Sequence, residues 1–355
     1  MHLLEQLETS LKGKRDLDAT QIAEAVRALT NPELAAEVKM RFLCALTDKG
    51  ETTEEIAAFA RELRELSVIP PIDLKTRQRG ILDVCGTGGD QLNTYNISTT
   101  VALIAASAGI AVAKHGNRGI TSKSGSADVL EALGISVNLS PAKAAESLGQ
   151  HNFAFFYAPQ YHPAFQHISA ARKLCATQGK KTIFNFLGPL LNPARPQFQL
   201  AGVPRPALCA PLAKVLQTLG SLRAMVVSGE VPDETSGTIR YLDEISTLGE
   251  THVAEFYQER GFTESAMSPH FYPLQSAKLQ DLAGGGPSEN AQIIRDILSG
   301  RDQGPRRDAA LLNSAAALFV SGKCATMQHG WELANELIDS GAAQAKVKEL
   351  MGVIN

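Results

Sequence analysis

The stretch GTGGDQLNTYNIST, from Gly86 to Thr99, lies between a strand-like run (residues 80–84) and a helical pattern that begins near Thr99. A glycine-rich turn in this position leaves backbone N–H groups near the positive end of a helix dipole, where phosphate commonly binds. Its glycines also let a ligand approach the backbone closely. The stretch predicts a phosphate-binding loop, although a glycine turn with an ordinary N-cap explains such a motif when it stands alone.

A second stretch, KHGNRGITSKSGSAD (residues 114–128), again separates a strand pattern from a helix pattern. It brings Lys114, Arg118 and Lys123 together with three serines, and both basic side chains suit phosphate oxygens. Two such loops in one sheet domain predict a ligand with two phosphate groups or a pyrophosphate. Taken singly, His115 is more often a packed or capping histidine, and Ser126 is a good N-cap in any protein.

A third stretch, VVSGEVPDETSG (residues 226–237), is an apolar strand pattern that ends in Asp233 and Glu234. Adjacent carboxylates at the end of a strand suit a hard cation such as Mg²⁺, which binds one or two carboxylates, water and substrate phosphates. On its own, an acidic pair of this kind is usually a solvated loop. Beside two phosphate loops it becomes a predicted metal site.

Composition limits the protein class. The 355 residues favour two domains, and a net charge of -3 argues against a nucleic-acid-binding stripe or a polybasic membrane anchor. Five scattered cysteines without a CxxC motif or zinc-site spacing predict a reduced, cytoplasmic protein. No apolar run reaches membrane-spanning length, and the N-terminus lacks the pattern of a signal peptide.

The pattern of the chain predicts a small helical domain over residues 1–72 and a large α/β domain over residues 73–355, with a central, mostly parallel sheet covered by helices. In the first part, Asp18 offers a helix cap, Thr52 to Glu55 has the capping-box spacing, and Pro70-Pro71 stops the helices. Helices around 160–180 are expected to complete this domain. The expected strands cover residues 80–85, 110–115, 135–139, 153–157, 222–228 and 251–257. The expected helices of the large domain cover 99–108, 127–134, 141–149, 206–219, 288–299, 308–321 and 327–340.

With these elements placed, nearly the whole chain resembles the anthranilate phosphoribosyltransferase family. The matching stretches include GTGGD (86–90), NIST (96–99), KHGNR (114–118), SKSGSADVLEALG (122–134), YAPQYHPAF (157–165), TIFNFLGPLLNPA (182–194) and GGGPSENAQIIRDILSG (284–300). The resemblance implies transfer of phosphoribose from phosphoribosyl pyrophosphate (PRPP) to the amine of anthranilate, with one or two Mg²⁺ ions. It also implies a homodimer formed through the helical domain, with no nucleic acid or membrane partner.

The resemblance also assigns residues to sites. Ser98, Asp233 and Glu234 match metal positions, and Gly86, His115, Asn117 and Arg172 match positions that line the anthranilate site. Lys114 is expected to act electrostatically, without a nucleophile or general base. The PRPP positions are Gly86, Gly89, Asp90, Thr94, Asn96, Ile97, Ser98, Thr99, Lys114, His115, Gly116, Asn117, Arg118, Ser122 and Ser126.

Two departures from the family pattern concern these residues. The family usually reads Asp-Gly-Leu-Asp-Glu at the metal loop, whereas residues 230–234 read Glu-Val-Pro-Asp-Glu. The segment 173–181 after Arg172 is a few residues longer than usual, which affects where Arg172 lies. A guanidinium facing the cleft can pair bidentately with a carboxylate, but a surface arginine is the plainer interpretation of this position.

Two other functions remain as alternatives. Pyrimidine nucleoside phosphorylases share the two-domain plan, but they carry a Lys-His-Ser-Thr-Gly-Gly loop where this chain has Val-Cys-Gly-Thr-Gly-Gly (residues 84–89). A non-catalytic homologue of the same fold that binds nucleic acid would need a basic stripe, and the net charge of -3 is against one.

Overall fold

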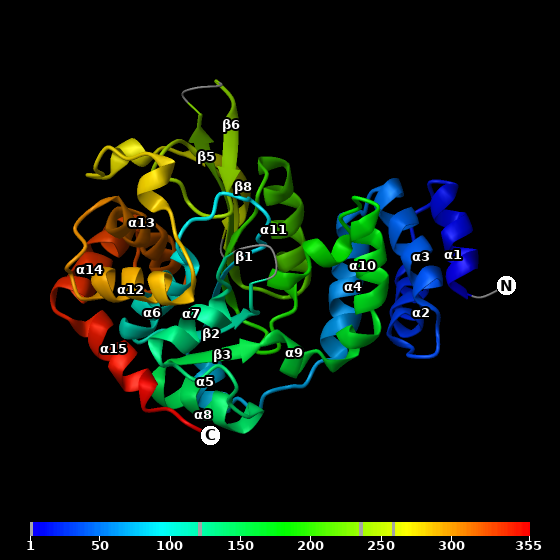
Figure 1. Cartoon of the computed structure of the whole chain (residues 1–355), viewed down its shortest axis with the longest axis horizontal. Coiled ribbons are helices and arrows are strands. Elements are labelled where there is room, and N and C mark those ends of the chain that lie inside the picture. The colour runs from blue at the N-terminus through cyan, green and yellow to red at the C-terminus, as the bar shows by residue number, and fades with distance from the viewer. Residues whose placement is uncertain (1–2, 120–122, 234–236, 258–259) are drawn as a thin grey trace.

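The computed structural model describes residues 3–119, 123–233, 237–257 and 260–355. Its N-terminal part is a bundle of four helices, seen in blue in Figure 1. Both predicted capping sites are present, because the side chains of Asp18 and Thr52 accept hydrogen bonds from Gln21 N and Glu55 N, respectively. The four helices are α1 (Leu3–Lys12), α2 (Ala19–Thr30), α3 (Ala36–Lys49) and α4 (Thr53–Glu65).

A fifth helix of this unit, α10 (Ser169–Thr177), comes from much later in the chain and packs against α3 (Figure 1). Its N-cap residue Ile168 and its residues Ala171 and Cys175 are fully buried in one apolar cluster with Phe42 and Leu43 of α3. The buried Lys39 links the two segments, since its Nζ donates to the carbonyl oxygens of Asn31 and His167, each at 2.7 Å. Two separate stretches of sequence therefore build the helical unit.

The large unit is an eight-stranded sheet in the order β3-β2-β1-β4-β5-β7-β8, with β6 paired to β5. The first five strands of this order are parallel, and β6, β7 and β8 add antiparallel pairs. A small helical domain and a larger domain with a mostly parallel sheet are thus confirmed. The strands are β1 (Ile81–Gly86), β2 (Ala111–Gly116), β3 (Phe153–Tyr157), β4 (Phe198–Gly202), β5 (Arg223–Pro232), β6 (Ile239–Leu242), β7 (Thr251–Tyr257) and β8 (Arg260–Met267).

Helices cover both faces of the sheet (Figure 1). Alternate strand residues explain this, since Leu82 and Val84 pack under α6 and α13, while Ile81 packs toward α8 on the opposite face. The helical unit and α11 cover the face that carries Ala201 and Val226. The helices are α5 (Leu74–Gln78), α6 (Ile97–Ser107), α7 (Ser126–Leu133), α8 (Pro141–His151), α9 (Ala158–Tyr161), α11 (Cys209–Thr218), α12 (Pro287–Leu298), α13 (Pro305–Val320), α14 (Met327–Asp339) and α15 (Ala342–Met351).

The predicted strand at 135–139 is wrong. Gly134 takes φ 86° and Ile135 N donates to Leu130 O at 2.9 Å, so this segment closes helix α7. Ile135, Val137 and Leu139 alternate because they are buried in the core, without forming a ladder. The strands β4, β6 and β8 were not predicted. Within the described part of the chain, no helix combines the length and apolar character needed to span a bilayer.

Candidate active site

The two predicted phosphate loops follow β1 and β2, which are neighbouring parallel strands. Their carboxyl ends therefore meet at one edge of the sheet, where ligands of open α/β folds bind. Two contacts join the loops directly: Asn96 Nδ2 donates to Ser124 O at 3.3 Å, and Lys114 Nζ lies 3.2 Å from Ser98 Oγ. The tertiary structure thus makes one site from two stretches.

Lys114 lies under this site rather than on its surface. Only 1% of its surface is exposed, and its Nζ donates to Val84 O at 2.7 Å. Burial lowers the pKa of Lys114, while the nearby carboxyls of Asp83 and Glu244 oppose that shift. Asp83 is also fully buried, and burial raises its pKa to about 6 despite a hydrogen bond from Asn192 Nδ2. A buried cation is thus held directly behind the two loops.

An acidic pair that the sequence did not single out reaches the loops from the end of β6. Asp243 Oδ2 accepts a hydrogen bond from Gly88 N at 2.7 Å, and Glu244 Oε1 accepts one from Ser98 N at 3.2 Å. Two glycines permit this approach. A Cβ atom at Gly86 would lie 2.2 Å from Asp243 Oδ2, and one at Gly202 would lie 1.5 Å from Asp243 O.

Three carboxyl groups, those of Asp90, Asp243 and Glu244, lie close together here. Burial, followed by the neighbouring carboxyl of Asp90, raises the pKa of Asp243 to about 7. Burial and Asp243 raise the pKa of Glu244 well above its ordinary value. Among the residues that the structure describes, no group of three His, Cys, Asp or Glu side chains is placed to hold a metal ion alone. A cation at this pair would therefore need oxygens from a bound ligand or water to complete its coordination.

The structure separates Asp233 from the acidic pair Asp243 and Glu244 along the β5–β6 hairpin. Leu242, the residue before Asp243, pairs with Gly229 of β5. Asp233 follows Gly229 by four residues, so Asp233 and Leu242 are roughly 14 Å apart along the ladder. Glu234 lies outside the described residues. The hairpin also contacts the first loop, since Leu92, Val231 and Leu242 form a small buried cluster and the Arg240 guanidinium donates to Gln91 O at 3.3 Å. The acidic pair near the loops is thus Asp243 and Glu244.

A sequence signal for this pair did exist. Residues 242–244 read Leu-Asp-Glu, the ending of the family pattern at the metal loop. Because the β5–β6 hairpin separates them from the end of β5, the earlier acidic pair at 233–234 occupied the expected position. Asn290 is a second residue that was missed: its Nδ2 donates to Asn96 Oδ1 at 2.8 Å, and its Oδ1 accepts from Gly285 N.

The remaining predicted residues of the first loop divide into two groups. Asp90 and Gly89 lie at the loop, and Thr94 forms a bridge with Ala283. Ile97 and Thr99 are buried in the first turn of α6, so their side chains face the core. Any role they have in binding must therefore come from the backbone.

The second loop is closed by Asp128, whose Oδ2 accepts hydrogen bonds from Gly119 N and Gly125 N. Gly116 packs closely here, since a Cβ atom would lie 2.2 Å from Ser126 Oγ. The guanidinium of Arg118 is already engaged, with contacts at 2.6 and 2.7 Å to Glu131 and at 3.1 Å to Asp128. Asn117 is exposed at the tip, and Ser122 lies outside the described residues.

An aromatic wall connects the second loop to the helical unit. The rings of His115 and His162 have centroids 5.2 Å apart, and His162 stacks on Phe165 at the same distance. Phe165 in turn lies against Phe184 at 5.6 Å, and the guanidinium of Arg172 lies 5.4 Å from the Phe184 centroid. Loop, sheet edge and α10 therefore share one continuous lining.

Burial lowers the pKa values of the three ionisable side chains in this wall, His115, His162 and Arg172. Burial lowers the pKa of His115 to about 3 and that of His162 to about 4, so both rings are neutral at pH 7. Burial also lowers the pKa of Arg172. Within the described part of the chain, Arg172 makes no hydrogen bond or ion pair, and the two histidine Nε2 atoms have no partner. The wall thus offers a cation without a counter-ion.

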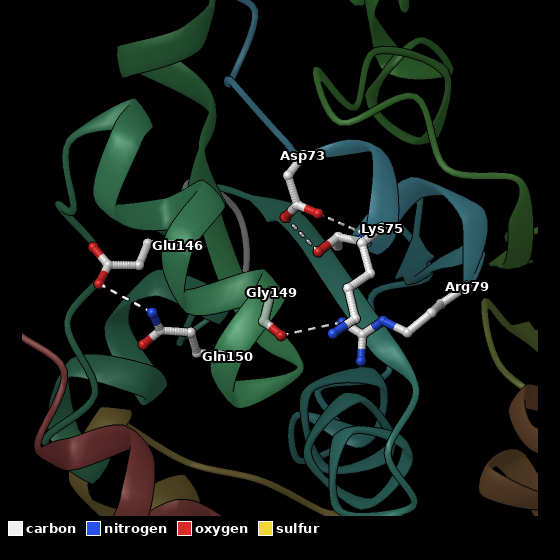
Figure 2. Close-up of a pocket in the computed structure, with 7 residues that line it drawn as sticks. Asp73, Lys75, Arg79, Glu146, Gly149 and Gln150 are labelled. Carbon is white, nitrogen blue, oxygen red and sulfur yellow. Dashed lines mark hydrogen bonds between the residues drawn. The ribbon is translucent and has the colours of Figure 1, made fainter.

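A separate surface hollow lies between α5 and α8 and is shown in Figure 2. Of its two basic residues, Lys75 and Arg79, Arg79 already donates to Gly149 O at 3.1 Å and to Asn152 Oδ1 at 3.0 Å. Asp73 caps α5 through Thr76, so it is engaged as well. This hollow contains none of the loop residues and is not the candidate site.

Comparison with known proteins agrees with this geometry. Residues 4–67 match the helical bundle domain of a glycosyl transferase family, and residues 78–344 match the a/b domain of that family. The anthranilate phosphoribosyltransferase of Petrotoga mobilis is 41% identical over 349 residues, which is 98% of this chain and 96% of the relative. That of Clostridium kluyveri is 42% identical over 99% of this chain and 100% of its own. The chain belongs to the anthranilate phosphoribosyltransferase family.

Solved structures of anthranilate phosphoribosyltransferases have the same fold. The Thermus thermophilus enzyme superposes with a TM-score of 0.86 and is 36% identical, with 98% of each chain covered. The Saccharomyces cerevisiae enzyme in complex with PRPP and Mg superposes with a TM-score of 0.83 at 28% identity, covering 98% of this chain and 96% of that one. The division of this chain at residues 72 and 73 stays a prediction.

Proposed function

We propose that this protein transfers the 5-phosphoribosyl group of PRPP to the amine of anthranilate, giving N-(5-phosphoribosyl)anthranilate and pyrophosphate. This is the second step of the tryptophan branch of aromatic amino-acid biosynthesis. The observation that carries the proposal is the position of Ser98, which contacts both Lys114 Nζ and the Glu244 carboxylate. A cation and an acidic pair therefore meet at the start of a helix, beside a loop suited to a pyrophosphate.

The two loops would bind the phosphates of PRPP through backbone N–H groups and hydroxyls. Gly86, Gly89, Asn96 and Ser98 belong to the first loop, and Asn117 and Ser126 to the second. Arg118 is less suited to direct phosphate binding, because Glu131 and Asp128 occupy its guanidinium. Its proposed role is to hold the second loop on α7.

Mg²⁺ fits the residues at the acidic pair. Asp243 and Glu244 supply two carboxylates, Ser98 supplies a hydroxyl, and Mg²⁺ commonly takes one or two carboxylates with substrate phosphates and water. Bound Mg²⁺ would neutralise charge on the pyrophosphate. One or two ions are part of the proposal, and Asp233 is not, because the β5–β6 ladder separates it from Asp243 and Glu244.

The aromatic wall is the proposed acceptor site. Arg172 would pair with the carboxylate of anthranilate, and the rings of His162, Phe165 and Phe184 would lie along the benzene ring. An aromatic amine is already neutral at pH 7, so its attack on the anomeric carbon requires no strong base. Neutral His115 and His162 fit that requirement, since neither would add positive charge beside the amine.

In the reaction, the bond from the anomeric carbon to the pyrophosphate oxygen breaks, and a carbon–nitrogen bond forms. The amine then loses one proton to solvent. The transition state resembles an oxocarbenium ion, and negative charge grows on the leaving pyrophosphate. Lys114 and the loop N–H groups are preorganised to stabilise that charge. Holding the amine near the anomeric carbon supplies much of the remaining rate enhancement.

We also propose that the protein is a homodimer formed through its helical unit and works in the cytoplasm, both on the family resemblance. Light scattering of the purified protein tests the dimer: a mass near 76 kDa, about twice the 37.9 kDa of the chain, is expected. A monomer at micromolar concentration would contradict it.

The activity is tested by incubating the protein with PRPP, MgCl₂ and anthranilate and following the loss of anthranilate fluorescence. Consumption that needs all three components is expected. Thymidine with inorganic phosphate, and a labelled oligonucleotide, test the two alternatives. Turnover of thymidine, or binding of the oligonucleotide without turnover of anthranilate, would overturn the proposal.

A further inference from the structure

The segment after Arg172 (residues 173–181) is fastened to α3 by several contacts. Gln178 Nε2 lies 3.3 Å from Met40 Sδ, Lys180 forms an ion pair with Asp48, and Cys175 Sγ lies 3.9 Å from Met40 O. The two sulfur atoms of Cys44 in α3 and Cys175 in α10 lie 3.7 Å apart. A pair of thiols therefore spans the joint between the two stretches of chain that build the helical unit.

From this geometry we infer that Cys44 and Cys175 form a reversible disulfide that tethers α10 to α3 and thereby changes the position of Arg172. The oxidant would be hydrogen peroxide or an organic hydroperoxide. The existence of the bond is independent of the proposed activity, whereas its effect on anthranilate binding rests on the proposed function.

The two thiols differ in access. Cys44 is partly exposed and lines a surface hollow of about 420 Å³ together with Met40, Asp48 and Gln178, so a small oxidant can reach it. Cys175 is fully buried, and burial raises its pKa to about 12. Cys44 is therefore the group that reacts first, and Cys175 is the resolving thiol.

The chemistry balances in two steps. The Cys44 thiolate attacks one oxygen of the peroxide, the O–O bond breaks, and the products are a Cys44 sulfenic acid and water (or an alcohol), which carries the former thiol proton. Cys175 Sγ then attacks Cys44 Sγ, and the S–O bond breaks. The departing hydroxide takes the Cys175 proton and becomes a second water. The two sulfurs are oxidised by two electrons in total, and the peroxide is reduced by two.

Closing the bond has a mechanical consequence. The sulfur atoms must approach from 3.7 Å to the roughly 2.05 Å of a disulfide, so side-chain rotation or a shift of α10 must bring them together. Arg172 lies three residues before Cys175 on the same helix, close enough for the two groups to interact electrostatically. Displacement of a positioning group by about 1 Å can cost up to roughly a hundredfold in rate.

The bond is tested first without any activity measurement. The intact protein is treated with hydrogen peroxide, its free thiols are counted, and it is digested with trypsin without reduction. The chain has five cysteines, and we expect two of them to be lost to thiol reagents and recovered on treatment with dithiothreitol. Mass spectrometry should find the peptide 42–49 joined to the peptide 174–180. Its absence, or Cys44 held only as a mixed disulfide or a higher oxide, would overturn the inference.

Kinetics then test the consequence. Oxidation of the wild type should change the KM for anthranilate at least about fivefold and spare the KM for PRPP, with reversal by dithiothreitol. Cys44→Ser should abolish both the link and the kinetic change, whereas Cys324→Ser, at another partly exposed cysteine, should preserve both. A linked protein with an unchanged anthranilate KM would overturn the effect on Arg172. A linked protein that never consumes anthranilate would instead count against the proposed function.

Discussion

The guanidinium of Arg172 lies 5.4 Å from the ring centroid of Phe184, and no described carboxylate pairs with it. Arg118, the other arginine among the predicted site residues, is held by Glu131 and Asp128. A partly buried arginine over an aromatic ring, at the joint of two structural units, retains its hydrogen-bonding capacity for a ligand. This geometry supports the proposal that Arg172 pairs with the carboxylate of anthranilate.

Arg172→Ala should raise the KM for anthranilate and spare that for PRPP. Loss of a charge-assisted contact costs on the order of 1.5–3 kcal/mol, or roughly tenfold to a hundredfold in affinity. The measurement is steady-state kinetics with each substrate varied in turn. Lys173→Ala, at the neighbouring position on the same helix, is the control and should behave as the wild type. A higher KM for PRPP alone in the Arg172 variant would remove Arg172 from the acceptor site.

Asp243→Asn and Glu244→Gln should each raise the Mg²⁺ concentration that gives half-maximal activity, by about tenfold or more. Asp233→Asn should leave it unchanged, because the β5–β6 ladder separates Asp233 from Asp243 and Glu244. Activity is titrated with MgCl₂ at fixed PRPP. The reverse pattern, with a shift in the Asp233 variant only, would return the metal site to the first acidic pair.

Gly89→Ala should weaken PRPP binding in calorimetry. Gly89 has φ +87° and Gly109, in the turn between α6 and β2, has φ +83°; a Cβ atom at either meets no protein atom within 4 Å. The backbone strain of about 1–3 kcal/mol is thus similar at the two positions, and only Gly89 belongs to the proposed site. Gly109→Ala should lower the Tm by a similar amount and keep PRPP affinity. Equal affinities in both folded variants would exclude the first loop from the site.

His162 should make the free energy of unfolding depend on pH in the acidic range. Burial lowers its pKa from 6.5 to about 4, so below pH 6.5 the unfolded chain binds a proton that the folded one rejects. The free energy of unfolding is therefore unaffected by this group above pH 6.5 and falls as the pH drops toward 4, by up to about 1.4 kcal/mol per pH unit. His162→Gln should reduce that slope in urea titrations at pH 4.5–7.5. A slope identical to that of the wild type would show that His162 is not buried in its neutral form.

Local sequence determined the parts of the structure that short-range physics controls. Thr52 and Asp18 predicted helix starts because a capping box satisfies N–H groups within one turn. The runs before Gly86 and Lys114 predicted β1 and β2, and the glycines and hydroxyls after them predicted two anion loops. The strand at 135–139 failed because alternation reports burial, and a buried loop after α7 alternates as a strand does.

Only the tertiary structure decided which residues meet. Asp243 and Glu244 lie more than 140 residues from the loop that they contact, and an intervening hairpin placed another acidic pair where the pattern was expected. In the same way, α10 joins α3 across more than 100 residues and so fixes Arg172 at the aromatic wall. Periodicity and capping are set by neighbours within a few residues. Contacts between distant segments depend on strand register, on close approach at glycines and on the packing of whole elements, which a single sequence leaves open.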